Sequence, residues 1–172
     1  MRSWAALLLA LSPAVPLAGC ATGTAPAEAS SVEAAPASPP ADSANRGERT
    51  QVTSDIDAQR LLANKGVTLQ WIDWNTRGTA IVTGGEGLWT LRGAQTQANG
   101  PGRLFLDGRI LEIGPGYFTF EGVIRITDTP DGGRTCEARK TWHFAVTQNR
   151  PYYRLREFEW CDGLTDYVDI YF

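Results

Sequence analysis

Alternating apolar and polar positions run through most of the chain after residue 66. Val67, Leu69 and Trp71 alternate with polar neighbours, and short apolar runs bounded by glycine follow at 79–82 and 88–91. Such alternation is typical of strands with one buried face, and turn residues recur about every 8 to 12 positions. The pattern predicts about six to nine strands in a mainly β domain, either a small antiparallel β-barrel or a sandwich.

The segment 117–128 has the clearest strand pattern. Its apolar residues share one face and are Phe118, Phe120, Ile124 and Ile126. Gly122 lies between them, and a glycine inside a strand indicates a bend or bulge of the kind that a closing sheet needs. Asp107-Gly108 lies between two apolar runs and predicts a two-residue hairpin turn.

One short N-terminal helix is predicted in the segment 53–66. Ser54 can cap it, and Asp55 and Asp57 fall in its first turn, where the helix dipole favours negative charge. Gly66 can end it. The apolar side of this helix is expected to consist of Ala58, Leu61 and Leu62.

Two alternating segments near the C-terminus flank a short polar turn and predict a long hairpin. Centring the turn between Gln148 and Asn149 brings apolar residues, one opposite-charge pair and two cysteines into register. The predicted pairs are Val146 with Pro151, Phe144 with Tyr153, Trp142 with Leu155, Lys140 with Glu157, and Cys136 with Cys161. We therefore expect a disulfide between Cys136 and Cys161, with a structural role because the chain has no C-x-x-C spacing.

The other face of this hairpin is the best candidate for a binding surface. It is expected to carry His143, Arg154, Arg156, Phe158 and Trp160. Guanidinium groups beside aromatic rings can recognise carboxylates, phosphates, sugars or an acidic loop of another protein. The same pattern is also typical of a solvated sheet face on which the arginine stems cover the rings.

Large aromatic residues offer a second place where a ligand could bind. They are Trp71, Trp89, Phe118, Phe120 and Trp142. In a barrel they could line an interior that holds an apolar ligand, as in lipocalin-like proteins. The alternative is that they fill the core, which a domain of about 105 residues needs for its stability.

The N-terminus predicts export from the cytoplasm. Residues 1–19 combine a positive charge at Arg2 with an apolar run and small residues, as a secretory signal peptide does. The sequence Leu17-Ala18-Gly19-Cys20 resembles the lipobox of bacterial lipoproteins. This resemblance implies that Cys20 carries a diacylglycerol and an acyl chain such as palmitate, and that the protein is anchored in a membrane by these lipids. Ala21 follows the cysteine, so the outer membrane is the expected location, facing either the periplasm or the surface.

The segment 20–50 is predicted to be a disordered tether. It consists mostly of Ala, Pro, Ser, Thr and Glu, which cannot bury enough apolar surface to offset the entropy cost of folding. The expected organisation is a signal peptide at 1–19, the tether at 20–50 and one β domain at 51–172.

Charge and composition then narrow the function. The chain has 16 basic and 19 acidic residues, which argues against nucleic acid as a partner. His143 is the only histidine, and we find no nucleophile elbow or metal-ligand spacing, so we expect no metal, no cofactor and no enzymatic activity.

These features together predict a lipid-anchored envelope protein whose non-catalytic β domain binds a periplasmic or surface partner, either a protein or a glycan, or a small ligand. In plan it resembles the small β-barrel lysozyme-inhibitor lipoproteins, which combine an anchor with a disulfide. Two alternatives stay open: a structural or assembly lipoprotein that uses its tether to span to a partner, and a lipocalin-like carrier of an apolar ligand.

Overall fold

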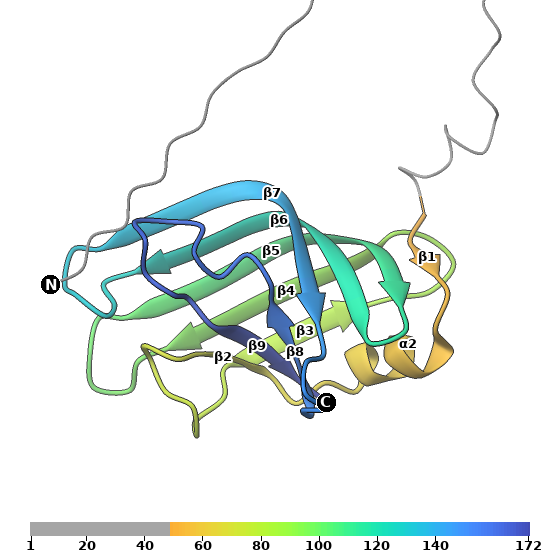
Figure 1. Ribbon diagram of the computed structural model, residues 1–172, viewed down its shortest axis with the longest axis horizontal. Helices are drawn as coiled ribbons and strands as arrows, with labels where there is room; N and C mark the ends of the chain where they lie inside the picture. Colours follow the sequence, from red (N-terminus) through yellow and green to blue (C-terminus); the bar gives the residue numbers. More distant parts are fainter. Residues whose placement is uncertain (1–48) are drawn as a thin grey trace, which may run out of the picture. The chain divides into compact units, whose positions relative to one another are not determined.

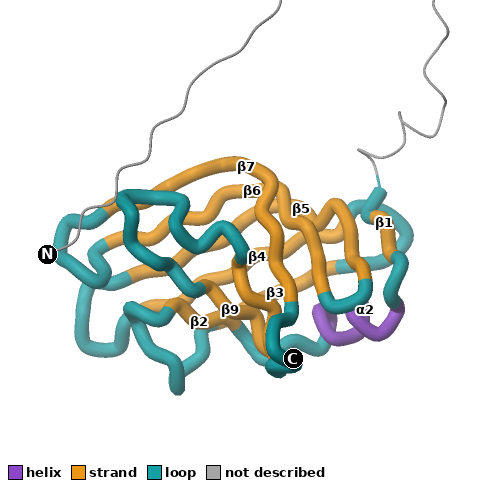
Figure 2. Tube along the Cα trace, viewed as in Figure 1, coloured by secondary structure: helices purple, strands orange, loops and turns teal. Residues whose placement is uncertain are grey.

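Residues 49–172 form one β-sheet accompanied by a single short helix (Figure 1 and Figure 2). The structure is a computed structural model that describes these residues, so the predicted signal peptide, Cys20 and nearly all of the predicted tether lie outside the described part. The elements are β1 (Gln51–Val52), α2 (Asp55–Leu62), β2 (Val67–Leu69), β3 (Thr79–Thr83), β4 (Trp89–Thr96), β5 (Arg103–Gly114), β6 (Tyr117–Thr127), β7 (Thr135–Ala145), β8 (Tyr152–Leu155) and β9 (Val168–Tyr171). The predicted mainly β fold with one N-terminal helix is confirmed. No helix within residues 49–172 is long and apolar enough to cross a membrane.

The sheet curls into a nearly closed antiparallel barrel. Its strand order is β2-β9-β8-β7-β6-β5-β4-β3, with β1 added in parallel to β5. The two end strands meet at one point, where Val67 and Gly78 exchange backbone hydrogen bonds. Gln95 on β4 strengthens this closure, because its side-chain oxygen accepts a hydrogen bond of 2.6 Å from the backbone N–H of Leu69. Of the two predicted architectures, the barrel is therefore the correct one.

Aromatic side chains fill the inside of the barrel. Phe118, Phe120, Trp142 and Phe144 are fully buried, as the alternating pattern predicts. The rings of Phe118 and Phe144 stack at 4.8 Å, and Phe120 meets Phe144 edge-on at 6.4 Å. Ring pairs of this kind contribute packing energy beyond the area they bury. Four of the five aromatic residues proposed to line a ligand site, Trp89 among them, are thus part of a packed core, and the fifth, Trp71, is partly buried against it.

The predicted turn at Asp107-Gly108 is wrong. Both residues lie inside β5, where Gly108 pairs with Gly122 of the neighbouring strand β6. A Cβ atom on Gly108 would lie 2.2 Å from the carbonyl oxygen of Glu121 and 2.8 Å from the ring of Phe120. The two glycines are therefore needed because two strands and a large ring approach closely there, and not because the chain reverses.

The helix α2 forms where the sequence predicts it. Ser54 is its N-cap and accepts a hydrogen bond from the backbone N–H of Asp57. Two details of the prediction are wrong. The apolar side consists of Ala58 and Leu61, whereas Leu62 is exposed, and the C-cap is Ala63 instead of Gly66.

A buried carboxylate joins this helix to the barrel. Asp57 is 2% exposed and accepts hydrogen bonds from the hydroxyls of Ser54 and Tyr153, both at 2.6 Å, and from the backbone N–H of Gly116 at 3.0 Å. Burial by itself raises the pKa of the Asp57 carboxyl, but these donors, with Arg60, lower the pKa overall. Asp57 thus stabilises the position of α2 against β8 and the β5–β6 turn.

The predicted register of the last hairpin is wrong by two residues. Phe144 faces Leu155 and Ala145 faces Arg154. The predicted turn does form, with Gln148 and Asn149 both at φ 54°. Val146 and Pro151, the residues next to this turn, do not pair as strand residues. Pro151 has no N–H to donate, and the N–H of Val146 donates to the carbonyl of Gly116 instead. A shift of two residues keeps the side chains of the paired strands β7 and β8 on their predicted faces.

The predicted ion pair between Lys140 and Glu157 is also absent. The Glu157 carboxylate accepts a hydrogen bond of 3.0 Å from the backbone N–H of His143, and the Lys140 ammonium lies 4.3 Å from the ring centre of Trp142. The cause is that β8 ends at Leu155, so no strand continues opposite Lys140.

Candidate functional site

The residues between β8 and β9 form a loop, here called the 156–167 loop, where the sequence predicts the end of a strand. The loop is held to β7 by the predicted disulfide between Cys136 and Cys161, whose Cα atoms are 6.0 Å apart. Both sulfur atoms and the Asp162 carboxylate lie within 4.8 Å of one another. Sulfurs joined in a disulfide are not thiolate ligands, so this group is a structural staple and not a metal site.

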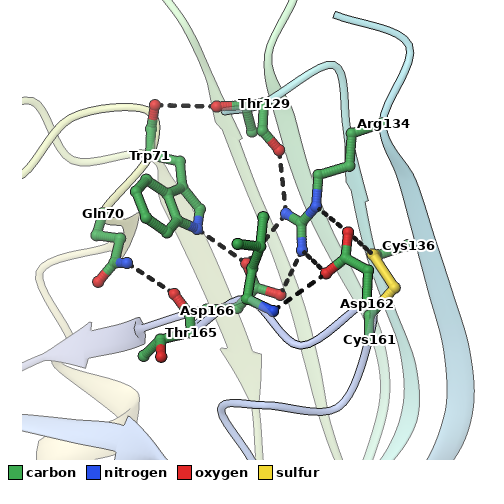
Figure 3. A network of polar contacts seen from close by, with 10 residues as sticks. Gln70, Trp71, Thr129, Arg134, Cys136, Cys161, Asp162, Thr165 and Asp166 are labelled. Carbon is green, nitrogen blue, oxygen red and sulfur yellow. Dashed lines mark hydrogen bonds and ion pairs between the residues drawn. A yellow bond between two sulfur atoms is a disulfide. The ribbon is translucent and has the colours of Figure 1, made fainter. Parts of the chain in front are cut away.

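A buried arginine next to the disulfide also holds this loop (Figure 3). The guanidinium of Arg134 donates to the carboxylates of Asp162 and Asp166 at 2.8 to 3.0 Å and to the carbonyl of Thr129 at 3.0 Å. The indole N–H of Trp71 donates to Asp166 at 3.0 Å. The Arg134 side chain is 6% exposed and Asp166 is fully buried. We call these groups the Arg134 cluster, in which the charge of Arg134 is satisfied within the fold.

An open groove of about 450 Å³ lies along the outside of β8, between the β7–β8 turn and the 156–167 loop. Its lining residues are Thr147, Gln148, Arg150, Arg154, Arg156, Phe158 and Tyr167. These side chains supply guanidinium, hydroxyl, amide and aromatic groups, with no carboxylate among them. Such a lining offers hydrogen-bond donors and positive charge to a ligand. We call this site the arginine groove.

Arg154 lines the arginine groove with a side chain whose position is fixed by its neighbours. Its Nε and Nη2 atoms both donate to the carboxylate of Asp169 on β9, each at 2.7 Å, and its guanidinium lies 4.1 Å from the ring centre of Tyr167. Burial raises the pKa of the Asp169 carboxyl, and Arg154 opposes this effect by stabilising the ionised form. The paired arginine is thereby held in one position at the edge of the groove.

The other two arginines of the groove are not paired in this way. Among residues 49–172, neither Arg150 nor Arg156 has a carboxylate oxygen within 4.0 Å. Arg150 donates to the hydroxyl of Tyr152 at 2.9 Å, and Arg156 is exposed and lies 5.9 Å from the ring centre of Phe158. The groove therefore presents three guanidinium groups against the single carboxylate of Asp169, which leaves two positive charges uncompensated.

The structure brings together three of the five residues in the predicted binding face, namely Arg154, Arg156 and Phe158. His143 lies on the outside of β7 with its ring 5.4 Å from that of Tyr117, and it does not line the groove. Trp160 turns inward and meets Trp142 edge-on at 5.2 Å, so it packs against the core. The alternation of faces ends with β8, which is why Trp160 no longer follows the strand pattern.

Two important members of the groove were missing from the sequence prediction. Arg150 comes from the β7–β8 turn, and Tyr167 comes from the end of the 156–167 loop. Tyr167 is placed by the pairing of β8 with β9, in which Arg154 faces Asp169. The only local signal for this arrangement is the alternation in residues 167–172, which predicts a strand but not its neighbour.

Comparison with known proteins decides the family of this chain. The sequence profile of the PM1083 family matches residues 49–172, the part that forms the barrel. This chain belongs to the PM1083 family. Within it, the chain is 32% identical over 115 residues to the protein named Uncharacterized protein PM1083 from Pasteurella multocida (strain Pm70). The aligned residues cover 66% of this chain and 74% of the relative. No solved structure matches the chain.

Proposed function

We propose that this PM1083-family chain is a lipid-anchored envelope protein whose barrel has no catalytic role and binds an anionic partner in the arginine groove. The location rests on the lipobox-like sequence that ends at Cys20. The binding role rests on the groove itself. Its expected partner is a protein or glycan of the periplasm or the surface, where a lipid anchor at the outer membrane holds the barrel.

The observation that carries the proposal is that some arginines have carboxylate partners in the described part of the chain and others, gathered in the groove, do not. Arg60, Arg92, Arg109, Arg125, Arg134 and Arg154 all form salt bridges with carboxylates of the same chain. Among residues 49–172, the salt bridges include none from Arg49, Arg77, Arg103, Arg139, Arg150 or Arg156. Of these, Arg150 and Arg156 lie together with Arg154 in one groove. Placing like charges together costs energy unless a counter-charge binds, so this arrangement favours an external anion.

Two other functions are less well supported. A lipocalin-like carrier needs interior space, but Phe118, Phe144 and Trp142 occupy the inside of the barrel. A structural lipoprotein that spans to a distant complex depends on tether length, which lies outside the described residues. Deleting half of the predicted tether at 20–50 separates the two roles, because a spanning role is then lost whereas binding by the groove is kept.

Site-specific photocross-linking in cells tests the proposal. The photoreactive residue p-benzoylphenylalanine is placed at Phe158 in the groove and, as a control, at Ile81, which is 61% exposed on β3. We expect an adduct from position 158 that is lost when Arg150→Gln and Arg156→Gln are combined. Absence of an adduct at position 158, or the same adduct from both positions, contradicts binding in the groove. Labelling with a fatty acid, which we expect Cys20→Ala to abolish, tests the anchor separately.

A further inference from the structure

We propose that the arginine groove binds a segment of a partner protein through two carboxylate side chains. This inference rests on the proposed binding function and adds the chemical class of the ligand. The expected segment is extended and acidic, and it carries Glu or Asp residues next to an apolar side chain.

The charge of the groove determines how many carboxylates the ligand is expected to carry. Arg150 and Arg154 both donate to the hydroxyl of Tyr152, at 2.9 and 3.3 Å, so one oxygen atom holds two cations close together. Asp169 compensates Arg154. The groove then has two positive charges in excess, since neither Arg150 nor Arg156 forms a salt bridge with a described residue, and two acidic side chains would neutralise them.

The donors that remain free define how the ligand is held. The Nη1 atom of Arg154 makes no hydrogen bond to any described residue, and the guanidinium of Arg156 makes none. A guanidinium offers parallel N–H groups that match the two oxygens of a carboxylate. Because Arg154 is held by Asp169 and the Tyr167 ring, it provides a rigid reference point beside the two arginines that form no salt bridge among the described residues.

The surroundings of the groove favour a protein segment over a small anion. Phe158 and Tyr167 line it, and Trp74 is 42% exposed with its ring centre 5.7 Å from the Arg154 guanidinium. Arginine with Tyr, Trp and Phe is the combination enriched in the centres of protein–protein interfaces. The groove is also open to solvent, which suits side chains that project from an extended backbone better than a small ligand that must be enclosed.

Titration of the full chain, purified in a nonionic detergent, tests this inference. The probes are acetylated hexaglutamate, hexaglutamine of the same length, inorganic phosphate and dihexanoylphosphatidylglycerol below its micellar concentration. Binding is followed by calorimetry and by tryptophan fluorescence. We expect hexaglutamate to bind and hexaglutamine not to bind. Combining Arg150→Gln with Arg156→Gln should weaken hexaglutamate binding by about tenfold or more, and raised salt should weaken it too.

The matched control removes the same charge elsewhere. Arg49 and Arg139 are exposed and lie outside the groove, so combining Arg49→Gln with Arg139→Gln should leave hexaglutamate affinity within about twofold of the parent chain. Arg156→Gln alone serves as a second groove variant, because its exposed side chain has no salt bridge that folding could depend on.

The results distinguish an acidic protein segment from phosphate or a phospholipid as the ligand of the groove. Hexaglutamate binding that depends on Arg150 and Arg156 supports an acidic protein segment. Groove-dependent binding of phosphate or of the phospholipid, without hexaglutamate binding, overturns this inference while the proposed function stands. An adduct from position 158 without hexaglutamate binding also overturns only this inference. If no probe binds and no adduct forms, both the inference and the proposed function fail.

Discussion

The Arg134 cluster and the arginine groove both include residues of the 156–167 loop, but they use the same residue type in opposite ways. Arg134 is 6% exposed and is bound by Asp162 and Asp166, so its charge is neutralised inside the fold (Figure 3). Arg156 is exposed in an open groove and has no carboxylate partner among the described residues. The comparison teaches that an arginine with internal partners stabilises the fold, whereas arginines gathered without such partners indicate a ligand.

The largest effect is expected when the Arg134 cluster loses its cation. Arg134→Gln would leave Asp166 fully buried without its counter-charge, and removing one partner of a buried ion pair costs about 3 to 5 kcal/mol. Urea unfolding measures the loss. Arg156→Gln is the matched control and should change the unfolding free energy by less than about 0.5 kcal/mol. Equal losses in the two variants would contradict the difference between the two regions.

The disulfide next to the Arg134 cluster should make the second largest contribution. It closes a loop with a sequence separation of 25 residues, and cross-links of this size stabilise by about 3 kcal/mol. Replacing both Cys136 and Cys161 by Ser should therefore lower the melting temperature without abolishing the fold. A melting curve identical to that of the parent chain would show that the disulfide does not constrain the 156–167 loop.

Acid should reduce the stability of the fold by protonating two carboxylates, those of Asp57 and Asp162, that the fold holds in their ionised form. Hydrogen bonds lower the pKa of Asp57 below its ordinary 3.8, and Arg134 lowers the pKa of Asp162 below the same value. Their stabilisation is therefore fully present above pH 3.8 and is lost as the pH falls through the lowered values. Asp57→Asn should destabilise the protein at neutral pH and reduce the loss of stability below pH 3.8 in urea unfolding. An unchanged pH dependence would contradict the role given to Asp57.

The fold could be predicted from sequence wherever a local pattern determined it. Alternation with period two identified β6 and the inner face of β7, and the capping signals at Ser54 and Asp57 identified α2. The disulfide was predicted from the hairpin register and from export, and it forms although that register is wrong by two residues, because Cys161 reaches Cys136 from the 156–167 loop. Apart from two details of the helix, the wrong predictions involve contacts between distant segments. Gly108 is required by Phe120 and β6, and the hairpin register depends on the bond from Val146 to Gly116.

The site was predictable only in part for the same reason. Arg154 and Arg156 were found because they alternate along one segment, but the strand ends before Trp160 and the alternation ends with it. Arg150 and Tyr167 join the groove through the β7–β8 turn and through the pairing of β8 with β9. Sequence alone also could not show which arginines have carboxylate partners, because Asp169 reaches Arg154 from another strand.

The smallest expected effect gives the most direct test of whether the groove is a binding site or a part of the fold. Combining Arg150→Gln with Arg156→Gln removes two like charges that no described carboxylate compensates. Urea unfolding should show a free energy within about 0.5 kcal/mol of the parent chain, or slightly above it, because residues kept for binding often reduce stability. A loss of more than about 2 kcal/mol would show that these arginines support the fold as Arg134 does, and would contradict a groove left open for a partner.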